Sequence, residues 1–459
     1  LIIKKIKLSL FDTVYVLYLE TVSSSNKVND YILKNLSSIS SFKNTKKIDI
    51  ASVLPAPNTK EIKNEDEIEY FITNGFTIVI RGSSILGIET RADINRGIPT
   101  PDTEPAPNGP KDAFTENYQI NLGLIKKRLK SSKLKTDEFT IGRKTLTKVG
   151  LLYFEDIAEE ETVQLVEDKL KKIDIDGILD SSMIGQLISD EDKTRFPTYL
   201  ITERPDFVSK ALLEGKIVIV VDTSPFALIL PAFFIDFINP GIDQYHKSKN
   251  INFLKIVRFA CFFLSMSVPA IYIALVNYNQ ETIPTNLLVS FSIQRDGVPF
   301  PSVIEVLIML FVCEMLRESD LRFPNAYGSA ISILGALVLG DAAVSAGIVS
   351  PITIIIIALT FMASLIFTEI EVSNALRNLR FIFLFAAAFY GILGLVFASL
   401  YFLIRINKIH SFGKPYFYPL VPFDKTYFFK TAIKSPLKKD YKRSSILTKT
   451  NQTKQGENV

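Results

Sequence analysis

Three carboxylates lie within strongly apolar stretches of this chain, where a charged group is costly and therefore informative. Asp341 falls near the middle of the apolar segment 328–349, and Glu305 and Glu314 lie nearer the ends of the shorter segment 301–316. A carboxylate at the centre of a bilayer costs roughly 2.5–3.5 kcal/mol on insertion scales, so it should face protein or water. Such groups can line a path for cations. Asp341, Glu314 and Glu305 are therefore candidate pore or gating residues.

These carboxylates also have a structural interpretation. Asp341 is equally well explained as a hydrogen-bonded packing residue between helices. Glu305 and Glu314 are close enough to the ends of their segment to reach the membrane interface, and this simpler interpretation is favoured for both.

The residue inventory offers no catalytic set. The only two histidines, His246 and His410, are far apart in sequence, and Cys261 and Cys313 both fall inside apolar segments, where buried hydrophobic roles are expected. A Ser-His-Asp triad or a Cys/His zinc site is thus poorly supported. A formal net charge of +4, with many acids in the first half, disfavours nucleic-acid binding. We expect no enzyme, no metal and no cofactor.

The elements that must position these residues change character near residue 210. The chain up to there is rich in charges and alternates strand and helix patterns, whereas 211–404 is dominated by long apolar segments and 405–459 is basic. This distribution predicts a water-soluble module joined to a membrane domain, followed by a basic tail.

The first 210 residues predict two small α/β subdomains, over 1–98 and 138–210, joined by a proline-rich linker and a connecting helix over 99–137. In the first subdomain, strands are expected at 13–19 and 76–80, and helical spacing runs through Val28, Tyr31, Ile32 and Leu36. The connecting helix is expected near 117–130. In the second subdomain, a strand at 149–154 is followed by a helix capped by Asp156, a short strand or turn at 173–179 and a helix at 181–188.

The apolar half predicts a helical transmembrane domain of about four to six membrane segments. Four stretches approach the roughly 20 residues that a bilayer needs, and two more are shorter or interrupted. The four are 255–276, 328–349, 351–370 and 381–404, and the other two are 217–238 and 301–316. Within 217–238, a strand that leads into an interfacial or re-entrant helix is an alternative.

Basic residues do not settle the membrane topology. Basic clusters lie at the start of 255–276 (247–258), after 301–316, before 381–404 and at the start of the tail. These four regions cannot all face one side if 381–404 crosses once. One stretch must be re-entrant, or one basic region must face outward.

Small residues recur every fourth position along the segment that holds Asp341. Gly328, Ser332, Ala336 and Gly340 would let another helix approach closely. Packing within the chain is the expected role, and a seam between subunits is the alternative.

The segment before the first apolar stretch is a candidate for coupling the soluble module to the membrane. Glu203, Arg204, Pro205 and Asp206 form it, and Asp222 follows inside the apolar stretch. Arg204 and Asp206 can pair with each other or with the basic loop at Lys247, and a simple capped turn is the alternative. The basic tail is expected to be disordered or drawn to anionic lipid, at about 1 kcal/mol per charge.

An ordered set of short motifs resembles the A subunit of the GerA family of spore germination receptors. The motifs are FTEN at 114–117, IGR at 141–143, FPTYLITERPD at 196–206, VDTSP at 221–225, QETIPT at 280–285, DGVPFP at 296–301, LGDAAV at 339–344, GIVSP at 347–351 and SFGKPY at 411–416. The resemblance covers about 11–423. It departs from the family at 239–245, which replaces a Ser-rich, Glu-Asp-Tyr-Tyr-like segment.

The resemblance implies a membrane subunit that acts with a transporter-like, nutrient-binding B subunit and a C-type lipoprotein. It also implies a place in the inner membrane of a spore, and assembly of several copies into a nutrient-gated cation channel that triggers germination. A solute transporter with a regulatory soluble domain and a non-conducting receptor scaffold are the alternatives from other classes.

Overall fold

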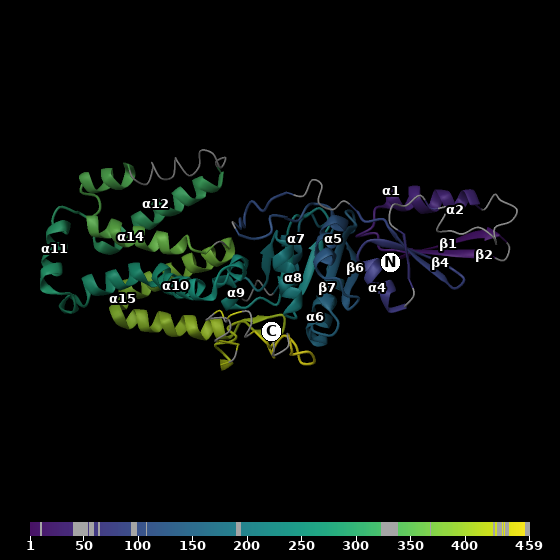
Figure 1. The fold of residues 1–459 in the computed structure, drawn as a ribbon. Coiled ribbons are helices and arrows are strands. Elements are labelled where there is room, and N and C mark those ends of the chain that lie inside the picture. The colour runs from purple at the N-terminus through teal and green to yellow at the C-terminus, as the bar shows by residue number, and fades with distance from the viewer. Residues whose placement is uncertain are drawn as a thin grey trace.

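The computed structural model describes residues 1–9, 12–39, 54, 59–62, 65–92, 99–106, 108–189, 194–322, 338–367, 369–425, 427–428, 434, 436 and 440–454. Within them the chain forms two antiparallel sheet domains followed by a helical region. The three parts follow one another along an elongated molecule, with the helices at the end opposite the first sheet (Figure 1).

The first domain is a five-stranded antiparallel sheet with helices on both faces. Its strands lie in the order β1 (Ile2–Ser9), β2 (Asp12–Tyr18), β4 (Phe76–Arg81), β5 (Ser84–Glu89) and β3 (Thr59–Glu61). One face is covered by α1 (Ser25–Val28), a π-helical turn (Asn29–Leu33) and α2 (Lys34–Ile39), and the other by α4 (Glu65–Thr73). The predicted strands at 13–19 and 76–80 and the helical spacing after Ser25 are confirmed.

The second domain repeats this architecture. Its strand order is β6 (Leu134–Ile141), β7 (Thr147–Phe154), β9 (Ile217–Val221), β10 (Ala227–Leu230) and β8 (Leu200–Thr202), again all antiparallel. Helices α5 (Tyr118–Arg128) and α8 (Pro205–Leu213) pack on one face, and α6 (Glu160–Lys171) and α7 (Ser181–Ile188) pack on the other. The predicted helices at 117–130 and 181–188 and the predicted strand at 149–154 are confirmed.

The structure differs from two expectations in this part of the chain, and it excludes the strand as one of the two alternatives for residues 173–179. Strands β9 and β10 belong to the second sheet, so the helical region does not begin at residue 211. All residues of these strands are buried, and such strands have the same continuous apolar composition as a membrane segment. Helix α6 begins after Glu159, because Asp156 lies in the preceding turn and pairs with Lys133. Residues 173–179 form no strand.

The helical region contains three helices of more than twenty residues and several shorter ones. Its elements are α9 (Phe234–Ile238), the 3₁₀ helix η4 (Gly241–Tyr245), α10 (Ser248–Asn277), the 3₁₀ helix η5 (Gln280–Thr282), α11 (Thr285–Arg295), α12 (Ser302–Arg322), α14 (Pro351–Ser364) and α15 (Ile370–Asn407). Residues 338–345 are also helical. By length and composition, α10 and α15 are the two described helices capable of spanning a membrane, and α14 is a shorter apolar helix. The expected four to six segments are therefore not confirmed.

Helix α15 reverses direction at Gly391, whose backbone angles (φ 57°, ψ −135°) are not helical. Three contacts with α10 show the reversal. Arg380 donates to the Ser265 carbonyl oxygen at 2.8 Å, Tyr278 donates to the Ala388 carbonyl oxygen at 2.6 Å, and the ring of Phe402 lies 6.1 Å from that of Phe262. The chain thus runs along α10 to its far end, turns, and returns beside it. The predicted single crossing over 381–404 is wrong, because Gly391 lies in its middle.

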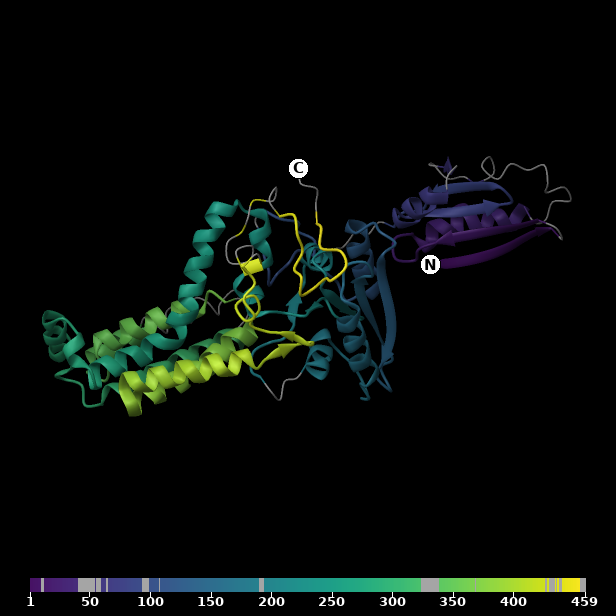
Figure 2. The ribbon, with the colours of Figure 1, turned by 90° about the horizontal axis from the view of Figure 1, so that it is seen from below.

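The second sheet and the helices share one hydrophobic core. The cluster that holds α5 and α8 against the sheet continues through Phe234 and Phe262 to Phe402 and Tyr416. The ring of Phe234 lies 4.9 Å from that of Phe262, and the ring of Phe196 lies 6.4 Å from that of Phe402. Figure 2 shows the second sheet lying directly against the ends of the helices. Because the core is continuous, these two parts pack as one unit.

The described part of the tail, 440–454, also packs on the second domain. Arg443 donates to the Leu213 carbonyl oxygen at 2.7 Å, and Lys449 pairs with Glu159 at 2.7 Å. Lys414, at the start of the tail, pairs with Glu159 as well. The expected disordered tail is thus wrong for these residues, because a buried carboxylate on the second domain holds them.

Candidate functional site

The junction between the second sheet domain and the helices is built around three buried residues that begin α8. Glu203 lies between β8 and α8, and its Oε1 atom accepts hydrogen bonds from the backbone N–H groups of Thr103 (2.7 Å) and Glu104 (2.8 Å). The backbone N–H of Phe114 donates to the Glu203 carbonyl oxygen at 2.8 Å. The described residues of the proline-rich segment 99–110 form no helix or strand, yet these bonds fix the segment against the junction.

Arg204 and Asp206 form a buried, bidentate ion pair. The guanidinium of Arg204, which is 2% exposed, donates from Nε (3.1 Å) and Nη2 (2.8 Å) to the two carboxylate oxygens of Asp206. Its Nη1 atom donates to the Glu104 carbonyl oxygen at 3.2 Å. Burial opposes the positive charge, but the hydrogen bonds and the charge of Asp206 outweigh it and raise the pKa of Arg204. Of the two predicted partners for Arg204, Asp206 is the one it contacts.

The same carboxylate reaches the segment that leads into α10. Gln244 donates to Asp206 Oδ2 at 2.9 Å, and the Tyr245 hydroxyl donates to the same oxygen. Burial, the hydrogen bond to Asp206 and its charge raise the pKa of Tyr245 to about 12. Both residues belong to η4, which falls in the segment 239–245 that departs from the family pattern.

Asp243, also in η4, connects this segment to the first turns of α10. Its carboxylate accepts hydrogen bonds from Arg258 at 2.6 and 3.1 Å. A continuous set of polar contacts therefore runs from the linker through Arg204, Asp206 and η4 to α10. Such a set can transmit a displacement of the soluble domain to the helix, because each of its bonds is directional and the central Arg204–Asp206 pair is buried.

Asp222 does not belong to this junction. Its Oδ1 atom accepts a hydrogen bond from the backbone N–H of Tyr118 at 3.2 Å, at the first turn of α5. Glu203, Arg204, Pro205 and Asp206 are brought together, whereas Asp222 follows β9, at the same strand end as Glu203 but on the other side of β10.

Glu305 is fully buried, in the first turn of α12. Its Oε2 atom accepts hydrogen bonds from the backbone N–H (2.9 Å) and hydroxyl (2.8 Å) of Ser350, the residue that precedes α14, and from Thr353 at 3.1 Å. Its Oε1 atom lies 3.5 Å from Arg295 Nε. A carboxylate at a helix N-terminus is stabilised by the unpaired backbone donors there. Glu305 therefore joins α12 to the start of α14.

Glu314 lies among three arginines. Its carboxylate is 2.9 Å from Arg377 and 3.9 Å from both Arg317 and Arg380. Arg317 also donates to the Ser364 hydroxyl at 2.9 Å, so the end of α12 is tied to the end of α14 and the start of α15. This network gives Glu314 a structural role in joining helices.

Asp341 differs from both glutamates because its side chain is exposed in the single chain. The neighbouring Val338 and Leu339 are 58% and 46% exposed. Among the described residues, no hydrogen bond or ion pair reaches the Asp341 carboxylate. A Cβ built on Gly340 meets nothing within 4 Å of the described atoms. The other three residues of the small-residue stripe, Gly328, Ser332 and Ala336, lie outside the described residues.

The charged ends of the helices are arranged asymmetrically. Four arginines lie at the end of the helical region that faces the second sheet. They are Arg258 near the start of α10, Arg317 near the end of α12, and Arg377 and Arg405 near the two ends of α15. The opposite end holds the turn at Gly391, the loops around α11 and the buried Glu305. Within the described residues, no group of three or more His, Cys, Asp or Glu side chains could hold a metal ion.

Two antiparallel sheet domains, joined through a buried polar junction to helices of which two are long and apolar enough to span a membrane, define the class of protein. The chain belongs to the Bacillus/Clostridium GerA spore germination protein family, whose profile matches residues 1–446. The predicted family is thus confirmed, and with it a place among spore germination receptor proteins.

Relatives cover nearly the whole chain. Spore germination protein KA of Bacillus subtilis (strain 168) is 37% identical over 99% of this chain and 85% of that protein. Spore germination protein A1 of the same organism is 34% identical over 88% of this chain and 84% of that protein. The crystal structure of the N-terminal domain of the A subunit of the Bacillus megaterium spore germinant receptor GerK3 is 30% identical, with a TM-score of 0.37 over 51% of this chain and 88% of that one.

Proposed function

We propose that this protein is the A subunit of a nutrient-gated germination receptor in the inner membrane of a spore. In this proposal several copies assemble around a cation path, together with a nutrient-binding B subunit and a lipoprotein C subunit. Nutrient binding in the receptor moves the soluble domains, and the junction at Arg204 and Asp206 passes that movement to α10.

The exposed carboxylate of Asp341 is the observation that carries the proposal. Placed in lipid it would cost roughly 2.5–3.5 kcal/mol, and within the described residues it has no partner that offsets this cost. A neighbouring copy or a water-filled path would remove the penalty. The space beside Gly340, which is open among the described residues, can accept a helix from another copy.

The apolar surface of the helices supports a membrane location. Phe389, Tyr390, Leu393 and Phe397 on α15 are each more than 60% exposed, and Ile256 on α10 is 68% exposed. Contiguous exposed apolar side chains of this kind are typical of surfaces that contact lipid or other subunits.

Replacing Asp341 by asparagine tests the cation path, because Asn keeps the shape of the side chain and removes the charge. We expect Asp341→Asn spores to hold the receptor at the normal level and oligomeric state, and to release monovalent cations more slowly after nutrient addition. Glu281→Gln is the matched control, since Glu281 is an exposed acid in η5, and it should leave release unchanged. Wild-type release by Asp341→Asn would remove Asp341 from the path.

Assembly is tested separately. Gly340→Leu fills the open space beside the helix and should reduce the oligomer detected by cross-linking, without loss of the monomer. Purification of tagged protein from detergent-extracted spore membranes should also recover the B and C subunits. Recovery of this chain in the soluble fraction would contradict the proposal.

A further inference from the structure

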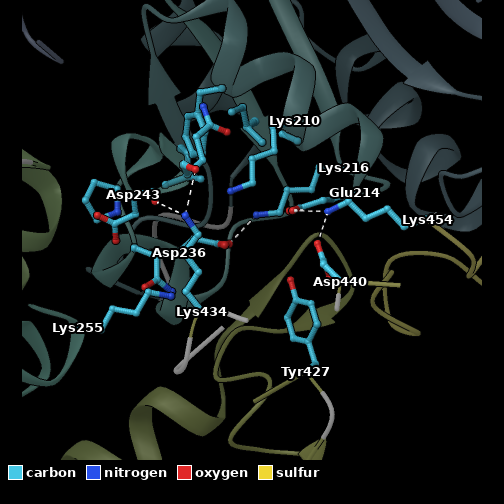
Figure 3. Close-up of a pocket in the computed structure, with 17 residues that line it drawn as sticks. Lys210, Glu214, Lys216, Asp236, Asp243, Lys255, Tyr427, Lys434, Asp440 and Lys454 are labelled. Atoms are coloured by element: carbon cyan, nitrogen blue, oxygen red, sulfur yellow. Dashed lines mark hydrogen bonds and ion pairs between the residues drawn. The ribbon is translucent and has the colours of Figure 1, made fainter. Parts of the chain in front are cut away.

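A polar pocket of about 270 Å³ lies where the second sheet domain, the start of α10 and the C-terminal tail meet. Its walls come from parts of the chain that are far apart in sequence, and five of its lining residues are lysines (Figure 3). They are Lys210 in α8, Lys216 before β9, Lys255 in α10, and Lys434 and Lys454 in the tail.

Each carboxylate of the pocket forms an ion pair with a nearby lysine or arginine. Asp236 pairs with Lys216 at 2.6 Å, and Asp243 pairs with Arg258 at 2.6 Å. Glu214 and Asp440 pair with Lys454, at 3.8 and 2.6 Å. These ion pairs use three cations for four carboxylates. Lys210, Lys255 and Lys434 add three more positive charges, so the lining holds five lysines against four carboxylates, an excess of one, and Arg258 outside the lining neutralises one of those carboxylates as well.

Two of these additional lysines direct positive charge into the pocket without a carboxylate partner. Lys434 donates to the backbone carbonyl oxygens of Asp243, Gln244 and His246 at 2.7–3.0 Å, so neutral groups fix its position. Lys210 is half-buried and has no hydrogen bond or ion pair among the described residues. Burial and the charge of Lys210 lower the pKa of Lys434, and Asp243 opposes this effect.

Figure 3 shows the side-chain ends of Lys210, Lys216 and Lys434 converging on the same space. Like charges held together at a partly buried site repel one another, and the repulsion is relieved when an anion binds between them. Ammonium groups on flexible stems are common ligands of phosphate oxygens, which each accept several hydrogen bonds.

We propose that this pocket binds a phosphate group, contacted by Lys210 and Lys434 with Lys255 beside them. A bound phosphate would connect α8, the first turns of α10 and the tail, which are otherwise held together by separate ion pairs. The group can come from free phosphate or from the headgroup of an anionic lipid, since the pocket lies at the end of the helices nearest the sheet domain.

The test uses the full chain in detergent, titrated with inorganic phosphate against chloride at equal ionic strength. We expect phosphate to raise the thermal unfolding midpoint in a saturable manner, whereas chloride should not. Lys210→Gln should weaken the apparent affinity about tenfold, because one charge-assisted contact is lost. Folding should survive, since Lys210 makes no hydrogen bond or ion pair with any residue that the structure describes. Lys210→Arg retains the cation and should bind like the original chain.

Lys148→Gln is the matched control, because Lys148 is an exposed lysine on β7 in the same domain and outside the pocket. A second arm replaces free phosphate by vesicles of phosphatidylcholine with or without phosphatidic acid. Stabilisation that needs phosphatidic acid and Lys210, without an effect of inorganic phosphate, would identify the lipid headgroup as the ligand. If neither ligand stabilises the chain, or if Lys210→Gln responds like Lys148→Gln, the proposed site is wrong.

Discussion

At the residue scale, Arg204 is the position where a single substitution should lower the free energy of unfolding most. Arg204→Ala would leave the Asp206 carboxylate buried without its bidentate partner. Removing one member of a buried pair typically destabilises a protein by about 3–5 kcal/mol, because the remaining charge stays desolvated. We expect a clear fall in the thermal unfolding midpoint of the detergent-solubilised chain, and weakened germination.

Arg143 offers the control for this experiment. It forms an ion pair of similar geometry with Asp174, but both side chains are about two-thirds exposed. Water screens such a pair, so Arg143→Ala should leave the midpoint nearly unchanged. Equal effects of the two substitutions would show that burial of the Arg204 pair is not what matters.

Sequence reasoning predicted the Arg204–Asp206 contact because the two residues are only two positions apart. The other members of the junction, Glu104 and Tyr245, are about 100 and 39 residues away from their partners, and no local pattern indicates such distances. Glu305 was placed near an interface because its position in the segment is all that sequence reveals. Its burial depends on Ser350 and Arg295, which only the packing of the helices brings to it.

At the element scale, the turn at Gly391 decides how α15 runs. Its backbone angles are ones that residues with a Cβ rarely adopt, and a Cβ there would lie 2.8 Å from the ring of Tyr278. Gly391→Ala should therefore destabilise the packing of α15 on α10 by roughly 1–3 kcal/mol. Cross-linking of Phe262→Cys and Phe402→Cys by a bifunctional maleimide, with Cys261 and Cys313 replaced by serine, measures whether the returning arm stays in place.

Gly297→Ala is the comparison. A Cβ at Gly297 would meet nothing within 4 Å, so this substitution should leave cross-linking unchanged. If Gly391→Ala cross-links as well as Gly297→Ala does, the reversal does not require glycine.

The docked tail gives a prediction for pH. Burial by itself would raise the pKa of Glu159, but hydrogen bonds from Lys414, Lys449 and Thr162 outweigh it, and the pKa is lowered. A lowered carboxyl pKa means that the docking energy is present above the unfolded value near 4.5 and is lost as the pH falls through the folded value. Acidification below this range should release the tail, which limited proteolysis of 440–454 would detect. Glu159→Gln should expose the tail already at neutral pH.

Strands with a continuous apolar, β-branched composition were predictable from sequence, and strands that mix charged with apolar residues were not. Strands β2, β4 and β7 are apolar and β-branched, and each was found. Strands β1 and β6 alternate lysines or acids with apolar residues and gave no clear signal, although both pair along their full length. The reversal in α15 did leave a trace in the sequence: the four basic regions fit one side of a membrane only if one stretch turns back.

At the scale of the whole molecule, the turn resolves that conflict. With α15 returning on itself, the basic residues of α10, α12 and both ends of α15 all lie at the end that contacts the second sheet. Single cysteines at Asp296 and at Lys408, in a chain without its native cysteines, should therefore react with an impermeant maleimide from opposite sides of the membrane. Labelling of both from the same side would contradict this topology.

The second sheet domain contacts the helical region on two sides. One contact is made by η4 at the start of α10, and the other by the returning arm of α15 together with the tail. Because both contacts belong to one continuous hydrophobic core, the second sheet domain and the near ends of α10 and α15 move together, as one arm of a lever. The far loops, which no soluble domain touches, would sweep through the widest arc.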